Sequence, residues 1–133
     1  MNVREIQRLG DWVYGAATNA VVGWSVSAYG SGRTNGRSIV GVGNPTGIAV
    51  RAGSDEFYVL NSGGGLYSVT TAGNTFGVTG RTTLPGSSGW GLEWVSTDNR
   101  LVATQPGTGN IYDISTSTWT PVLRRQGLHA PIF

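Results

Sequence analysis

"GGGLYSVTTAGNTF" occupies residues 63–76, and "TGNIYDISTSTWT" follows it at residues 108–120. Both segments pair a glycine-containing turn with a short alternating run and then a stretch rich in Ser and Thr. Tyr67 corresponds to Tyr112 and Val69 to Ile114, each 45 residues further on. The recurrence predicts two copies of one building block, and it sets the period for the rest of the chain.

Around these segments, four strand-like runs recur in the same order. The earlier copy contains "GIAV" (47–50), "EFYVLN" (56–61), "GLYSVT" (65–70) and "TFGVTG" (75–80). The later copy contains "GLEW" (91–94), "NRLVAT" (99–104), "NIYDIS" (110–115) and "TWTPVL" (118–123). Between the runs lie Asp98-Asn99, Gly63 to Gly65 and Gly107 to Gly109, which tolerate the positive φ of tight hairpin turns. We therefore expect each copy to form a four-stranded antiparallel meander.

The N-terminal third follows the same pattern less completely. "DWVYGA" (11–16), "AVVGWSVSA" (20–28) and "RSIVGV" (37–42) match second, third and fourth strands, but no first strand is recognisable before them. "GLHAPIF" (127–133) begins like "GLEW" and has no successor, so we expect it to supply the missing strand. This gives an N-terminal arm at 1–10 and a three-unit domain at 11–133, with one unit shared between the two termini.

This pattern resembles a β-propeller, whose blades are four-stranded meanders of 40 to 50 residues. The resemblance lies in the period and strand count alone, because none of the motifs of the named propeller subfamilies occurs. Three blades are fewer than the four to eight that close a ring. The resemblance therefore implies a homodimer that forms a six-bladed ring, as in some short lectins. A β-sandwich or a small barrel is the alternative all-β fold.

Composition and charge exclude several classes of protein. Of 133 residues, 22 are Gly and only 12% are charged, as is typical of short strands joined by tight turns. The chain has no Cys, and its nine basic residues, all Arg, are scattered along the sequence with a net charge of +2. This distribution argues against nucleic acid as a partner. Arg4, Glu5 and Arg8 interrupt any secretory signal, and no apolar run is long enough to span a membrane. We expect a soluble chain.

Residues suited to catalysis or metal binding do not form a recognisable set. His129 is the single histidine, and the seven carboxylates are dispersed. Asp55 and Glu56 are adjacent, so on a strand they would point to opposite faces. We predict no enzyme activity, no metal and no cofactor.

The tryptophans offer a better candidate site. Trp24, Trp94 and Trp119 recur near strand positions where an indole packs between sheets, so we expect them in the core. Trp90 stands in "SSGWG", between the fourth strand of one unit and the first strand of the next. Such loops gather at the mouth of a propeller ring, where ligands bind. Trp90, with Arg51 and Glu93 beside the first strands, is therefore the predicted ligand site.

Two classes of function agree with these features. One is a non-catalytic recognition module, lectin-like, that binds a glycan or another cell-surface ligand through several weak sites in one ring. The other is a structural or attachment subunit of a bacteriophage virion. A third interpretation is that the chain is an excised or engineered piece of a longer propeller.

Overall fold

The computed structural model of the chain describes residues 5–29, 36–71 and 76–125. Over these ranges it contains three four-stranded antiparallel sheets and one short helix, α1 (Val26–Tyr29). Sheet 1 consists of β1 (Glu5–Leu9), β2 (Trp12–Ala17), β3 (Ala20–Ser25) and β4 (Gly36–Ile39). Sheet 2 consists of β5 (Pro45–Val50), β6 (Glu56–Asn61), β7 (Gly65–Thr70) and β8 (Gly77–Thr83). Sheet 3 consists of β9 (Leu92–Val95), β10 (Arg100–Thr104), β11 (Ile111–Ser115) and β12 (Pro121–Arg125).

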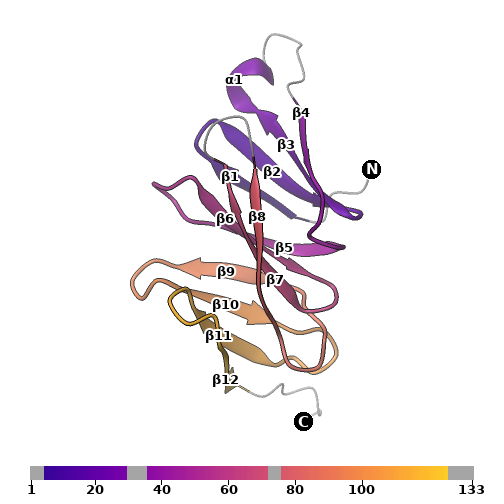
Figure 1. The fold of residues 1–133 in the computed structure, drawn as a ribbon, viewed down its shortest axis with the longest axis vertical. Helices are drawn as coiled ribbons and strands as arrows, with labels where there is room; N and C mark the ends of the chain where they lie inside the picture. Colours follow the sequence, from indigo (N-terminus) through magenta and orange to yellow (C-terminus); the bar gives the residue numbers. More distant parts are fainter. Residues whose placement is uncertain (1–4, 30–35, 72–75, 126–133) are drawn as a thin grey trace, which may run out of the picture.

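Each sheet is a simple meander, because its strands pair in chain order. The three sheets follow one another along the long axis of the molecule, with sheet 2 between sheets 1 and 3 (Figure 1). The first strands β1, β5 and β9 lie next to one another, and β5 contacts both of the others. The predicted all-β fold of repeated four-stranded units is confirmed.

The hairpin turns have the chemistry expected from the sequence. Asn99 has φ of 49° at the turn before β10, and Gly64 and Gly107 both have φ of 84°. A residue with a side chain rarely adopts such angles, whereas Gly and Asn do so at low cost. The Gly-rich and Asn-containing segments therefore serve as turns, as predicted.

One expectation about the first unit is wrong. Residues 5–9, placed in an N-terminal arm, form β1 and pair with β2 from Glu5 opposite Ala16 to Leu9 opposite Trp12. β1 therefore supplies the first strand of this unit. The pattern hid this strand, because its half-buried side begins with the polar Glu5 and Gln7 while the apolar Ile6 lies on the exposed side. Residues 127–133, proposed for this place, lie outside the described ranges.

The core is divided into two layers, one on each side of sheet 2. We call the face of a sheet toward the preceding sheet its front face, and the opposite one its back face. Phe57 on the front of sheet 2 lies 4.5 Å, centroid to centroid, from Tyr14 on the back of sheet 1. Tyr58 on the back of sheet 2 stacks on Trp94 of sheet 3 at 5.5 Å. Because neighbouring strand residues point to opposite faces, two consecutive aromatic residues join all three sheets.

The tryptophans expected in the core divide into two groups. Trp94 and Trp119 are partly buried against the layer between sheets 2 and 3, as predicted. Trp24 lies on the front face of sheet 1, which no described residue of another sheet covers, and its side chain is 36% exposed. The expectation of core packing is therefore wrong for Trp24, because it belongs to a terminal sheet.

The third strand of sheet 1 is shorter than the sequence suggested. It ends at Ser25, where residues 20–28 were expected to continue extended, and α1 follows. Asp11 stabilises this change of direction. Its backbone oxygen accepts a hydrogen bond from the amide of Val26, and its carboxylate accepts one from the amide of Ser27 at 3.0 Å.

None of the helices in the described part of the chain is long and apolar enough to cross a membrane.

Candidate ligand site

A pocket of about 270 Å³ opens between sheets 1 and 2. Its walls come from the β1–β2 turn, β2 and β4 of sheet 1, and from the two turns of sheet 2 that face them. The lining residues are Leu9, Gly10, Asp11, Trp12, Tyr14, Arg37, Ser54, Asp55 and Thr71. Aromatic, cationic and anionic side chains thus meet in one small concave space.

Arg37 on β4 is the central group of this pocket. Its guanidinium carbon lies 3.5 Å from the centroid of the Trp12 ring and 4.9 Å from that of Phe76 in sheet 2. Its Nη1 also donates to the hydroxyl of Tyr14 at 3.3 Å. Cation–π contacts of this kind contribute about 0.5 to 2 kcal/mol. Arg37 is therefore held in place by both sheets while it lines the pocket.

Gly23 makes this arrangement possible. It is the β3 residue paired with both Tyr14 on β2 and Arg37 on β4. A Cβ atom at position 23 would lie 2.9 Å from the Tyr14 ring. The absence of a side chain lets the ring lie flat across β3 toward Arg37. The shape of this part of the pocket thus depends on a cross-strand register rather than on a local motif.

The polar groups of the pocket have defined protonation states. Burial raises the pKa of Tyr14 despite the opposing hydrogen bond from Arg37, so its hydroxyl keeps its proton at neutral pH and remains a donor. Hydrogen bonds from Ser25 and Ser27 lower the pKa of Asp11, so this carboxylate is ionised at neutral pH. Asp55 lies on an exposed turn, and its backbone oxygen, not its carboxylate, accepts the two hydrogen bonds from Thr71.

This arrangement is suited to binding. Guanidinium and phenol donors stand beside carboxylate acceptors, so a ligand rich in hydroxyl groups could satisfy both kinds of partner. In residues 5–29, 36–71 and 76–125 there is no cluster of three His, Cys, Asp or Glu side chains that could hold a metal ion. His129 falls outside those ranges, and the expectation that the chain is not an enzyme stays a prediction.

The structure does not bring the predicted site residues Trp90, Arg51 and Glu93 together. The side chain of Trp90 is 55% exposed, and its backbone oxygen lies near Gly47. Arg51 comes four residues after Gly47, so its backbone lies about 13 Å from Gly47 at the usual rise of a strand. Its guanidinium lies 5.2 Å from the Trp94 ring. Glu93 is exposed on the face of β9 opposite to that of Trp94. The site at Trp90 stays a prediction.

Sequence reasoning missed Trp12 and Arg37, although a signal for Arg37 was present. The fourth strands carry Arg37, Arg81 and Arg124, which are 44 and 43 residues apart and so follow the repeat. Arg81 Nε donates to Ser68 at 2.8 Å, and its guanidinium lies 4.8 Å from the Trp119 ring of the next sheet. By strand register, Arg81 and Arg124 occupy the same bulged position of their sheets, whereas Arg37 pairs with Gly23 and so occupies the position of Thr79 in sheet 2.

Comparisons with known proteins identify the fold. No protein-family model matches the chain, and no curated protein matches its sequence. Among solved structures, a propeller-type chain in the crystal structure of the nidogen/laminin complex matches with a TM-score of 0.67 and 15% identity. That match covers 87% of this chain and 44% of the other. The chain has a β-propeller fold.

Two further propeller-type structures agree with this assignment. PorZ, a surface component of the type-IX secretion system of Porphyromonas gingivalis, matches with a TM-score of 0.65 and 18% identity, over 91% of this chain and 16% of PorZ. The N-terminal domain of Nup159 matches with a TM-score of 0.66 and 11% identity, over 93% of this chain and 36% of the other. The chain spans less than half of each of these propeller proteins. Its three four-stranded sheets correspond to propeller blades, and the likeness concerns the fold alone.

Proposed function

We propose that this chain is a non-catalytic recognition module that binds a sugar unit of a glycan in the pocket between sheets 1 and 2. The propeller fold agrees with a binding or structural role. The observation that carries the finer proposal is the pocket itself, which Arg37, held over Trp12, lines together with Asp11 and Asp55.

The chemistry of the pocket matches a polyol. Adjacent sugar hydroxyl groups accept hydrogen bonds from a guanidinium and donate hydrogen bonds to a carboxylate, and charged partners make such bonds stronger. Trp12 and Leu9 add an apolar wall for the C–H groups of the ring. A volume of about 270 Å³ lies just below the usual range for pockets that hold drug-sized ligands, so it suits one sugar ring.

A glycan-array screen followed by titration calorimetry tests the proposal. Arg37→Gln and Asp55→Asn should each weaken binding of the best glycan at least tenfold, since each removes one charged partner. Asp55→Asn is the cleaner variant, because the hydrogen bonds that hold this turn to Thr71 use the backbone oxygen of Asp55.

The controls come from the repeat. Arg81→Gln changes the arginine on the fourth strand of sheet 2 and should leave the affinity within about twofold, as should Trp90→Ala in the loop before β9. An array without any bound glycan would refute the proposal. Loss of binding in Trp90→Ala with full binding in Asp55→Asn would instead assign the site to the loop before β9.

A structural role, such as a virion or attachment subunit, is a second candidate. The observation that favours it is that sheets 1 and 3 each leave one face without a neighbouring sheet in the described structure (Figure 1). Subunits built to assemble expose such faces before assembly. The side chains on these two faces determine which partner they can bind.

A further inference from the structure

Within the described residues, no other sheet covers the front face of sheet 1, which is largely apolar and includes the exposed Arg8 beside Val13. It carries apolar side chains at positions whose counterparts in sheet 2 are buried against sheet 1. By strand register, the pairs of counterparts are Ile6 and Ile48, Val13 and Phe57, and Trp24 and Val69. Ile48, Phe57 and Val69 are fully buried, whereas Ile6 is 61% and Trp24 is 36% exposed. Sheet 1 thus has the surface of an internal blade, and no sheet of described residues lies in front of it.

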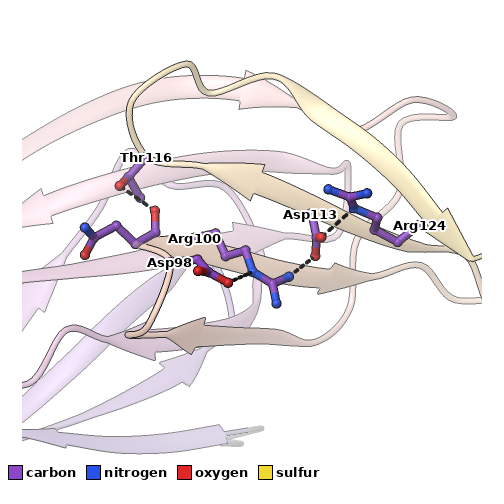
Figure 2. Close-up of polar contacts among 6 residues, drawn as sticks. Asp98, Arg100, Asp113, Thr116 and Arg124 are labelled. Carbon is purple, nitrogen blue, oxygen red and sulfur yellow. Dashed lines mark hydrogen bonds and ion pairs between the residues drawn. The ribbon is translucent and has the colours of Figure 1, made fainter.

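The back face of sheet 3 has a different character. Val102 stands where sheets 1 and 2 carry the interface tyrosines Tyr14 and Tyr58. Around it, Asp113 accepts from Arg100 Nη1 and from Arg124 Nε, both at 2.6 Å, and Arg100 also contacts Asp98 (Figure 2). These two arginines and two aspartates form a network without net charge, and the exposed Glu93 lies beside Val102 on the same face. A paired, neutral network can be covered at less cost than an isolated charge.

Arg124 repeats the geometry of an arginine that already joins two sheets. Arg81 bonds through Nε to the third-strand residue Ser68 and places its guanidinium over Trp119 of the following sheet. Arg124 bonds through Nε to Asp113, which has the same register position as Ser68. Its side chain is 62% exposed, and no aromatic ring of the described residues lies over it. The back face of sheet 3 therefore carries the connecting arginine of an interface, and no sheet of described residues lies beyond it.

We propose that the back face of sheet 3 docks on the front face of sheet 1 in a second copy of the chain. Two such contacts, related by a twofold axis, close six sheets into one ring. In this arrangement Val102 meets Val13 of the second copy, in the place of the contact between Tyr14 and Phe57. Trp24, which has the register position of the buried Val69, would be covered by this contact. The contact continues the interfaces between sheets 1 and 2 and between sheets 2 and 3.

Because the chain has no cysteine, engineered cysteines report on this contact without interference. The double variant Val13→Cys, Val102→Cys should be linked by a short bismaleimide into a covalent dimer with two links. Each single variant should stay a single chain, because the contact is head to tail and Val13 faces Val102 rather than itself. Circular dichroism confirms that each variant is folded before the linker is added.

Three results would overturn the proposal. Linkage in the Val13→Cys single variant would mean that two front faces pack on each other. A ladder of products above the dimer would mean that the contact is real but does not close. Only single chains from the folded double variant would mean that another partner covers sheet 1. Should the double variant fail to fold, the solution mass of the unmodified chain decides, since a monomer is incompatible with the ring.

Discussion

At the scale of single residues, Phe57 and Tyr58 connect the three sheets. Phe57 meets Tyr14 of sheet 1, and Tyr58 meets Trp94 and Trp119 of sheet 3, the latter at 5.9 Å. Aromatic pairs of this kind add about 0.5 to 1.5 kcal/mol beyond the area they bury. The hydroxyl of Tyr58 is buried and has no hydrogen-bond partner within the described residues. The central aromatic residue of the fold therefore includes a group that opposes folding.

Tyr58→Phe should stabilise the chain by about 1 kcal/mol at neutral pH, because it removes a buried hydroxyl that lacks a partner. Its effect should also depend on pH. Burial raises the pKa of Tyr58 from 10.0 to about 12, with the Glu56 carboxylate adding to the shift. Tyr58 ionises near pH 10 in the unfolded chain and near pH 12 in the folded chain, so this group leaves the free energy of unfolding independent of pH below pH 10 and lowers it as the pH rises from 10 toward 12.

Urea unfolding of both proteins from pH 8 to pH 12 measures this difference. The free energy of unfolding of the unmodified chain should fall more steeply above pH 10 than that of Tyr58→Phe. Parallel curves over the whole range would show that Tyr58 ionises equally in the folded and unfolded states.

At the scale of elements, the first strands determine how closely the sheets approach. Glu5 Oε2 on β1 accepts a hydrogen bond from the amide of Ile48 on β5 at 3.3 Å. On the other side of β5, a Cβ atom at Gly47 would lie 2.8 Å from the backbone oxygen of Trp90 and 2.9 Å from the amide nitrogen of Leu92. Backbone therefore packs directly on backbone at this border, and only glycine leaves enough room.

Gly47→Ala should destabilise the chain by about 2 kcal/mol, because backbone atoms of β5 and β9 would have to move apart. Gly36→Ala is the matched control in another strand, since the atom nearest to its added Cβ would be 3.9 Å away. Urea unfolding midpoints of the two variants provide the measurement. Equal midpoints would mean that the first strands separate at no cost.

The same elements show how far the sequence could predict the structure. The alternating runs of β6, β7, β10 and β11 were found because each has a buried side and lies beside a turn with its own signature. β1 escaped notice because its polar residues Glu5 and Gln7 lie on the half-buried side and Ile6 on the exposed side, which reverses the usual pattern. The pocket at Trp12 could not be predicted, since it depends on the register that places Gly23 between Tyr14 and Arg37. The short turn of α1 likewise depends on Asp11, a residue distant in sequence.

At the scale of the whole molecule, three blades form a sector of a propeller with two unlike end faces. The front of sheet 1 is apolar, with Trp24 exposed, and the back of sheet 3 combines valines with the network around Asp113. A propeller usually hides both faces of every blade by closing its ring with four to eight blades. With the proposed contact between two copies, this chain would meet that requirement with six blades.

Sedimentation equilibrium of the unmodified chain tests this closure most directly. It should give a mass of about 28 kDa, twice the 13.9 kDa of one chain, and the melting temperature should rise with protein concentration. Trp24→Asp should shift the mass to that of one chain, whereas Val78→Asp, at a residue of similar exposure on β8, should not. A cooperatively folded species of 13.9 kDa, with a melting temperature independent of concentration, would contradict the six-bladed ring.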